Sequence, residues 1–336
     1  MPCAWLFNPE NDIALARGTA NFTPPPAAVA MQRAGRLLPF FLAADSDFVI
    51  CDGVNAEQFD AFRRRFAIKA DVWNHCPDGL TPSPWGWSLA ARRRFANLGF
   101  PPSVLPSDAD LERWRLLSHR RTAALLARSL AGEGSLPLWP TAVEVSDPAR
   151  LPEVLLGLGR AVVKQPWSSS GRGVAFFTSG STSLDTVVRQ AAGTIRRQGS
   201  VMVEPFMPDH RDFALLYECA GGRARFLGPS LFRADPAGRY LGNLVASDEF
   251  LFQELCRLLP SDLLHSLIEG LARALTAIVA PGWSGPVGID ICCDPRATIH
   301  ICEANLRFTM GFVARAIARR LPPTSPFVLS PADWPD

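Results

Sequence analysis

The fold of this chain is decided by the stretch VGIDICCDPRATIHICEANLR, which covers residues 287–307. Two apolar runs, Val287 to Cys293 and Ile299 to Glu303, have the length of strands. The turn-forming residues 294–297 lie between them and predict an antiparallel hairpin. Because the strands of a hairpin run side by side, we expect polar residues from both runs to meet on one face.

Three side chains with oxygen donors lie on this hairpin. Asp290 and Glu303 are thirteen residues apart, and Asn305 follows on the same strand face as Glu303. Such oxygens suit Mg²⁺, which takes few protein ligands and completes its octahedron with phosphates and water. Two carboxylates about 4 Å apart would repel by about 4 kcal/mol at an effective dielectric near 20, so a metal or a base such as Arg307 must offset them. A salt-bridged strand pair is the alternative.

A second motif lies mid-chain, where the strand Arg160 to Gln165 delivers a lysine, Lys164. A loop of mostly small residues follows at once: Ser168, Ser169, Ser170, Gly171, Arg172 and Gly173. Small side chains let backbone N–H groups approach phosphate oxygens, and serine hydroxyls add donors. The chain has only two lysines, Lys69 being the other, so a lysine retained here favours a role for a compact ammonium. An ordinary hairpin turn is the alternative.

The order of lysine and loop excludes two other phosphate-binding motifs. A Walker loop ends in Gly-Lys-Ser/Thr, and no glycine directly precedes either lysine of this chain. In protein kinases the glycine-rich loop precedes the lysine, whereas here it follows.

A third motif is an apolar strand that ends in an acid and a proline. The strand covers Ser200 to Phe206 with Glu204 near its end, and Asp212 lies eight positions after this glutamate. Strands that end in Glu-Pro are common in many folds, so this motif has little specificity by itself.

Together the three motifs, in this order, resemble the ATP-grasp family over roughly Leu111 to Leu321. The resemblance implies an ATP-grasp fold of mixed α+β and α/β class, in which two lobes grip ATP. It implies that Lys164 and the loop after it hold the phosphates. It also implies that Glu204 holds the adenine at the hinge between the lobes and that Asp212 contacts the ribose.

The carboxylate hairpin carries the most specific part of the resemblance, the form Glu-x-Asn-x-Arg. It implies that Asp290, Glu303 and Asn305 bind one or two Mg²⁺ ions, for which Mn²⁺ can substitute. Arg307 resembles the arginine that steadies a carboxylate or an acyl phosphate. Family members often have a second phosphate-binding lysine before the lysine strand, and in its place this sequence has Arg120. Arginine can bind phosphate through two donors, so the role is retained.

The resemblance also predicts how the chain is divided. Residues 1–105 fit the small α/β domain that usually precedes an ATP-grasp domain. Residues 106–321 would form the ATP-grasp domain, with lobes at about 106–203 and 204–321. Residues 322–336 are a proline-rich tail that we expect to be loosely held.

Apolar spacing predicts further elements within these parts. Helical spacing runs from Leu111 to Leu130 behind a cap at Ser107 or Asp108. A single long helical stretch is expected from about Glu249 to Ala280, and a loop through Pro77 to Trp87.

Two regions are candidate contacts for acceptor substrates. A polar run directly follows the first strand and comprises Asn8, Glu10, Asn11 and Asp12. Ligands of open α/β sheets collect beyond the carboxyl ends of strands, although a solvated turn is the alternative for this run. Arg211 and Arg233 are further candidate contacts for anionic groups.

Composition limits the classes of function that remain. Of 336 residues, 48% are hydrophobic and 20% charged, so the chain can bury a sizeable core. A net charge of +2 with scattered basic residues argues against a nucleic-acid partner. The lack of a long apolar run and of a signal peptide predicts a cytoplasmic protein outside the membrane. Eight cysteines without a C-x-x-C pair indicate buried thiols rather than a zinc site.

The working hypothesis is an ATP- and Mg²⁺-dependent ligase that joins a carboxylate to an amine and releases ADP. Its substrates would be small-molecule or peptide carboxylates and amines. Their identity stays open, as does the oligomeric state, for which a dimer is allowed. Two alternatives remain: a non-catalytic nucleotide-binding protein, and an ATP-grasp enzyme that transfers phosphate or forms a thioester.

Overall fold

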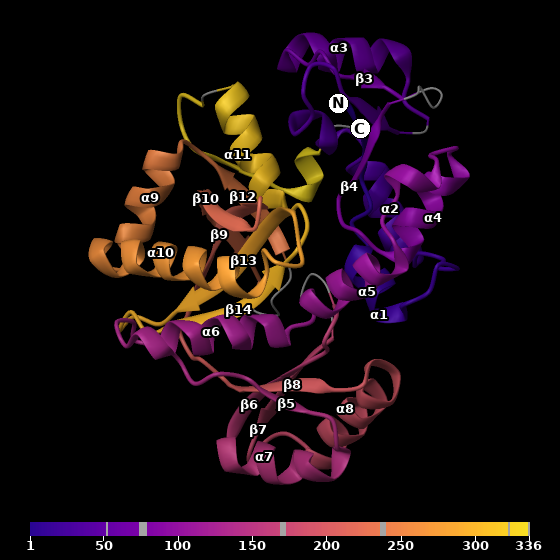
Figure 1. The fold of residues 1–336 in the computed structure, drawn as a ribbon. Helices are drawn as coiled ribbons and strands as arrows, with labels where there is room; N and C mark the ends of the chain where they lie inside the picture. Colours follow the sequence, from indigo (N-terminus) through magenta and orange to yellow (C-terminus); the bar gives the residue numbers. More distant parts are fainter. Residues whose placement is uncertain (52, 74–78, 169–172, 236–239, 322, 335–336) are drawn as a thin grey trace.

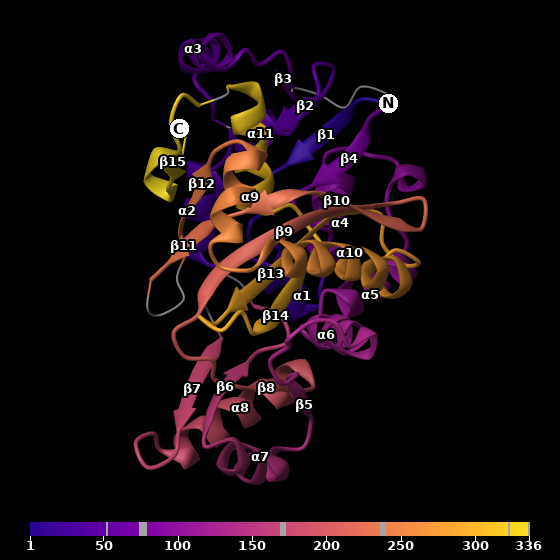
Figure 2. The same ribbon diagram turned by 90° about the vertical axis from the view of Figure 1, so that its left-hand side faces the viewer.

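The computed structural model describes the protein over residues 1–51, 53–73, 79–168, 173–235, 240–321 and 323–334. These residues form four β-sheets with helices packed against them. An N-terminal part and a central part lie side by side, and a small lobe projects from the central part (Figure 1, Figure 2). Within the described ranges, no helix combines the length and apolar character needed to span a bilayer.

The N-terminal part is a parallel sheet with the strand order β3-β2-β1-β4. Its strands are β1 (Cys3–Leu6), β2 (Phe48–Ile50), β3 (Asp71–Val72) and β4 (Thr81–Pro84). Its helices are α1 (Asn11–Arg17), α2 (Pro26–Ala34), η1 (Leu38–Phe41), α3 (Ala56–Phe66), α4 (Leu89–Asn97) and η2 (Pro102–Val104). β1 lies inside the sheet, and the chain leaves its carboxyl end and enters α1. Parallel sheets commonly bind ligands beyond the carboxyl ends of their strands.

The small lobe is an antiparallel sheet in the order β5-β8-β6-β7, with its helices on one face. Its elements are β5 (Val143–Val145), η3 (Pro148–Arg150), α7 (Leu151–Leu158), β6 (Arg160–Lys164), β7 (Val174–Thr178), α8 (Leu184–Gln198) and β8 (Val201–Pro205). Ala161, Val163 and Val203 pack in the core beneath the helices. Strand side chains alternate between faces, so Lys164 and Glu204 point to the opposite face.

The central part is built on the antiparallel sheet β10-β9-β13-β14. Its strands are β9 (Arg211–Ala220), β10 (Arg223–Ser230), β13 (Gly285–Cys293) and β14 (Ile299–Asn305). The surrounding helices are α5 (Asp108–Leu117), α6 (Arg121–Glu133), α9 (Asp248–Cys256), α10 (Ser261–Ile278) and α11 (Met310–Arg320). A small sheet in the order β11-β12-β15 adjoins it and consists of β11 (Phe232–Ala234), β12 (Tyr240–Val245) and β15 (Phe327–Leu329), followed by η4 (Pro331–Asp333).

The main core forms where α6 and α10 cover one face of this sheet. Leu264, Leu267, Leu271 and Leu275 recur at helical spacing on α10 and are fully buried. They pack with alternate residues of β9 and β13 such as Leu215. The other face of these strands carries apolar residues such as Leu216, which lies beside α11, and the polar residue Asp290.

Two predicted helical stretches are each interrupted. The stretch from Glu249 to Ala280 is two helices, α9 and α10, and Pro260 directly precedes α10. Proline has no N–H and clashes with the preceding turn, so a continuous helix is excluded there. The stretch from Leu111 to Leu130 likewise divides into α5 and α6, with Ser107 forming the predicted cap in a capping box with Asp110.

Two other expectations are wrong. The predicted loop through Pro77 to Trp87 contains strand β4, which pairs in parallel with β1. The proline-rich sequence showed no sign of this strand. The tail is not loosely held over its described part, because β15 pairs with β12 and Trp334 is buried. Trp334 packs edge to face with Phe7 at a ring separation of 6.2 Å, so apolar burial holds the tail.

Leu271 offers a test of this core. Leu271→Ala should lower the free energy of unfolding by about 2–5 kcal/mol, because the lost side chain leaves a cavity between α10 and the sheet. Leu156→Ala, at a position 54% exposed, is the matched control and should change stability little. Thermal unfolding of both variants checks this, and equal melting temperatures would contradict the assigned core.

Candidate active site

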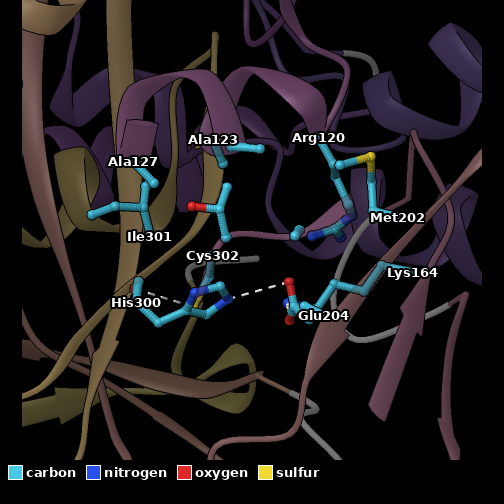
Figure 3. A pocket seen from close by; sticks show the side chains of 12 residues that line it. Arg120, Ala123, Ala127, Lys164, Met202, Glu204, His300, Ile301 and Cys302 are labelled. Carbon is cyan, nitrogen blue, oxygen red and sulfur yellow. Dashed lines mark hydrogen bonds and ion pairs between the residues drawn. The ribbon is translucent and has the colours of Figure 1, made fainter. Parts of the chain in front are cut away.

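The small lobe presents a pair of opposite charges to the central part. Lys164 at the end of β6 forms an ion pair with Glu204 on β8, and both side chains are almost fully buried. From the central part, Nε2 of His300 lies 3.2 Å from the other oxygen of Glu204 (Figure 3). Burial raises the pKa of Glu204, but Lys164 and His300 outweigh it and lower that pKa to about 2. Burial lowers the pKa of Lys164, and the carboxylate of Glu204 reverses this to a net increase.

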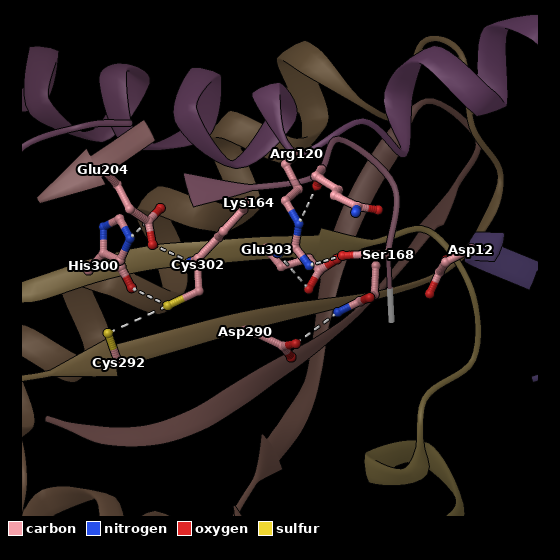
Figure 4. A network of polar contacts seen from close by, with 12 residues as sticks. Asp12, Arg120, Lys164, Ser168, Glu204, Asp290, Cys292, His300, Cys302 and Glu303 are labelled. Carbon is pink, nitrogen blue, oxygen red and sulfur yellow. Dashed lines mark hydrogen bonds and ion pairs between the residues drawn. The ribbon is translucent and has the colours of Figure 1, made fainter. Parts of the chain in front are cut away.

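Arg120, directly before α6, connects the lysine strand with the carboxylate hairpin. Its Nε donates to the carbonyl of Gln165 at 3.0 Å, and Nη2 donates to Oγ of Ser168 at 3.1 Å. Its Nη1 lies 3.0 Å from Oε2 of Glu303 on β14 (Figure 4). The predicted phosphate cation and the predicted metal ligand are therefore in direct contact, although about 180 residues separate them in the chain.

A pocket lies between these elements, and its polar lining includes Arg120, Lys164, Glu204, His300 and Cys302. Apolar side chains of α6 and Met202 complete it (Figure 3). Its free space is about 10 Å³, because the charged side chains fill it by pairing with one another. A nucleotide can occupy the pocket only if these pairs exchange partners.

Sequence reasoning missed His300 and Cys302, which belong to none of the three motifs, and β14 has an irregularity beside them. Asp290 pairs with Glu303, but the next pair is Ile291 with Ile301, so Cys302 is an extra residue in the ladder. A bulge of this kind shifts the alternation of side chains by one position. A signal was present in the sequence, since the isoleucines at 299 and 301 mark the core face and leave positions 300 and 302 for the other.

The hairpin brings the three predicted metal ligands together. Asp290 and Glu303 are cross-strand partners, and Nδ2 of Asn305 donates to Oδ2 of Asp290 at 3.0 Å. Burial raises the pKa of Asp290, the charge of Glu303 raises it further, and Arg307 only partly counters them, which leaves it at about 7. Asp290 thus lacks enough nearby positive charge to hold its carboxylate at the ordinary pKa.

This donor set fits Mg²⁺. A cation between Asp290 and Glu303 would relieve their repulsion, and Mg²⁺ commonly binds through one or two carboxylates together with substrate phosphates. Among the described residues, no group of three or more His, Cys, Asp and Glu is arranged to hold a metal ion. The donors at hand are two carboxylates and one amide, the kind of small oxygen set with which Mg²⁺ is commonly bound.

Arg307 joins this hairpin to the N-terminal part. Its guanidinium makes a two-pronged contact with Asp12 on α1, in which Nη2 lies 2.6 Å from Oδ2. Nη2 also donates to Oδ1 of Asn305 at 2.8 Å. Burial lowers the pKa of Arg307, but the carboxylate of Asp12 outweighs burial and the pKa is raised.

Solved structures with this arrangement of strands and helices are known, whereas no protein-family profile and no curated protein matches the sequence. The chain is similar to the biotin carboxylase domain of the 2-oxoglutarate carboxylase of Hydrogenobacter thermophilus, with 14% identity, a TM-score of 0.53, and coverage of 94% of this chain and 69% of that one. It is also similar to the biotin carboxylase of Campylobacter jejuni, with 12% identity, a TM-score of 0.54, and coverage of 94% and 70%.

The pyruvate carboxylase of Rhizobium etli is a third similar structure, with 13% identity and a TM-score of 0.54 over 95% of this chain and 27% of that one. The chain has the ATP-grasp fold. At these identities the likeness concerns the fold alone, so the functional residues rest on the geometry of this chain.

Within this ATP-grasp fold, the N-terminal polar run is largely engaged by the chain itself. Nδ2 of Asn8 donates to the carbonyl of Gly86 at 2.8 Å, and Asn11 lies so close to Gly86 that a Cβ there would clash with it. Glu10 is buried, which raises its pKa, and its Oε2 has no hydrogen-bond partner among the described residues. Asp12 is the member of the run that reaches the candidate site, through Arg307.

The remaining predicted residues lie at the margins of the pocket or beyond it. Asp212 on β9 is opposite Cys292 in the ladder, and burial raises its pKa. Arg211 begins β9 and Arg233 lies on β11, and both side chains are exposed. The structure brings neither arginine into contact with the pocket lining.

The loop after Lys164, which the sequence predicts to hold phosphate, is described only at its two ends. Ser168 accepts from Arg120, and Gly173 has a φ of +71°, where a Cβ would meet the side chain of Gln165 at 2.6 Å. Glycine is therefore required at the loop's end. The predicted contacts Ser169, Ser170, Gly171 and Arg172 lie outside the described residues.

The buried carboxylate of Glu204 predicts a dependence of stability on pH. Its pKa in the folded chain, about 2, lies below the ordinary 4.5, so it stabilises the fold above about pH 4.5 and this contribution is lost as pH falls toward 2. Glu204→Gln should lower the melting temperature at pH 7, because Lys164 loses its counter-ion. The difference from wild type should shrink between pH 4.5 and 2, and a constant difference would contradict the assignment.

Proposed function

We propose that this protein binds ATP and Mg²⁺ and joins a carboxylate to an amine, with release of ADP and phosphate. The contact of Arg120 with Glu303 carries the proposal. It joins a cation suited to phosphates with a carboxylate suited to Mg²⁺, and Lys164 lines the same pocket as Arg120. A shared site for a nucleotide and a divalent ion needs this combination of charges.

Two structures that share the fold support the nucleotide. The Hydrogenobacter domain was solved with ADP as its magnesium salt, with ADP, and with bicarbonate. The Campylobacter enzyme was solved with a β-γ-ATP ligand. A nucleotide phosphate chain is also the anion that would best replace the carboxylates now paired with Lys164 and Arg120.

Each side chain then has a defined task. Lys164 and Arg120 hold the phosphates once their present partners are exchanged, and Ser168 adds a hydroxyl donor beside them. Glu204 accepts from the adenine amino group at the hinge, and Asp212 accepts from the ribose. Asp290, Glu303 and Asn305 would hold Mg²⁺, which would supply positive charge to the phosphates.

The proposed reaction proceeds in two balanced steps. An oxygen of the substrate carboxylate attacks the γ-phosphorus, the bond to the β-γ bridging oxygen breaks, and ADP leaves. The amine nitrogen then attacks the acyl carbon, phosphate leaves with the electron pair of the acyl–oxygen bond, and the nitrogen loses a proton. Positioning and charge supply most of the rate, so the chain needs no strong protein base. The loop from Ser168 to Gly173 would exclude water that hydrolyses the acyl phosphate.

The proposal includes the division of the chain. Residues 1–105 would be the pre-ATP-grasp domain, and residues 106–203 and 204–321 the two lobes around the nucleotide. Substrates would be small-molecule or peptide carboxylates and amines, bound near Arg307 and the N-terminal part. A non-catalytic nucleotide-binding protein is disfavoured, because mere binding does not require the half-buried carboxylates of Asp290 and Glu303 to lie opposite each other.

Lys164 tests the nucleotide assignment. Lys164→Ala should raise the dissociation constant of ADP about tenfold or more, because a buried ammonium is lost from the phosphates. The chain provides one matched control, since its only other lysine, Lys69, lies on the surface in a pair with Asp45. Calorimetric titration should find Lys69→Ala unchanged, and equal effects of the two variants would remove Lys164 from the site.

Glu303 tests the ligase reaction. Phosphate release should be screened with mixtures of carboxylates and amines, and the product identified by mass. Glu303→Ala should abolish turnover that depends on Mg²⁺ while the protein stays folded. Glu133→Ala removes a surface carboxylate paired with Arg273 and should leave turnover intact. Turnover of Glu303→Ala within tenfold of wild type, a barrier change below about 1.4 kcal/mol, would contradict the assignment.

A further inference from the structure

The donors of Arg307 are almost all used by the chain itself. A guanidinium has five N–H donors. Nε faces both oxygens of Asp12 at 3.1 Å, Nη2 donates to Asp12 and Asn305 at 2.6 and 2.8 Å, and Nη1 donates to the carbonyl of Phe308 at 3.2 Å. Among the described residues, one N–H of Nη1 is left for another acceptor. As it stands, this arginine cannot grip a substrate carboxylate with two donors.

The contacts form one continuous chain from the N-terminal part to the candidate metal ligands. Asp12 on α1 accepts from Arg307, Arg307 donates to Oδ1 of Asn305, and Nδ2 of Asn305 donates to Asp290. The first and last carboxylates belong to segments about 280 residues apart. Arg307 thereby sets which end of the Asn305 amide faces Asp290.

We propose that Asp12 is a positioning residue that keeps Arg307 paired and away from the candidate metal carboxylates. The inference rests on the proposed function, and it assigns to the N-terminal part, through Asp12, a role in keeping the Mg²⁺ site free of Arg307. The side chains of Arg307 and Asp12 are only 15% and 12% exposed, so this guanidinium needs a nearby anion. Asp290 and Glu303 are the other carboxylates that act electrostatically on it.

Loss of the Asp12 charge therefore has a defined consequence. Arg307 would turn toward Asp290 and Glu303 and compete there with Mg²⁺ for the same oxygens. The affinity for ADP without metal should change little, because Asp12 does not line the nucleotide pocket. The gain in ADP affinity on adding Mg²⁺ should fall.

The structure contains a matched control pair. Asp248 on α9 and Arg315 on α11 form the same two-pronged contact, with Nε at 3.0 and 3.1 Å from the carboxylate oxygens and Nη2 at 2.7 Å. This pair contributes no residue to the pocket lining or the carboxylate hairpin. Asp248→Asn therefore shows how far the loss of such a contact by itself changes the ADP dissociation constants, since it leaves the site residues unchanged.

The experiment measures ADP dissociation constants by calorimetry in EDTA and in excess Mg²⁺. Asp12→Asn should reduce the gain from Mg²⁺ about tenfold and leave the constant in EDTA within threefold of wild type. Asp248→Asn should leave both constants unchanged. If Asp12→Asn retains the full gain, or if both variants lose it equally, the proposal is overturned.

A double variant separates positioning from simple loss of structure. Asp12→Asn with Arg307→Met removes the freed cation together with its partner, so the gain from Mg²⁺ should recover to within threefold of wild type. A purely structural role predicts a double variant no better than Asp12→Asn, and that result would overturn the proposal. Wild-type protein that binds no ADP in either condition would overturn the proposed function itself, and this inference with it.

Discussion

Charges removed from water need partners, and in this molecule the partners come from different parts of the chain. Glu303 is paired with Arg120, Glu204 with Lys164 and His300, and Asp12 with Arg307. Each contact crosses between elements that are distant in the sequence. The relative positions of the small lobe, the carboxylate hairpin and the N-terminal part at this site depend on them, since breaking a buried pair leaves a charge without compensation.

Within the proposed function, these pairs are also where a ligand would act. Of the described residues, Arg120 and Lys164, the two cations proposed to hold phosphates, are each paired with a carboxylate, so a nucleotide would exchange one anion for another and add little new buried charge. The carboxylates released from Arg120 and Lys164 would then need a cation in turn. Within the proposed function, this links phosphate binding to metal binding through the chain's own electrostatics.

The sheets explain why these side chains can meet. Apolar residues at alternate positions of β6, β8, β9 and β13 are buried under helices. On β6 and β8, the intervening residues Lys164, Met202 and Glu204 line the pocket, and on β13 Asp290 faces Glu303. The bulge at Cys302 then turns two consecutive residues of β14 toward the same side. The same strands therefore pack in the core with one face and position site residues with the other.

Local sequence patterns determined the hairpin, the lysine strand and the chemical character of Lys164, Asp290 and Glu303, because alternation and turn residues act over a few positions. Tertiary structure decided the rest. The pairing of Arg307 with Asp12, the entry of His300 into the pocket and the docking of the tail through Trp334 depend on segments remote in the chain. Short-range periodicity can give the face on which a side chain such as His300 lies, but not the element that it meets there. The single-residue bulge at Cys302 also reverses the face that alternation with Ile301 predicts for Glu303.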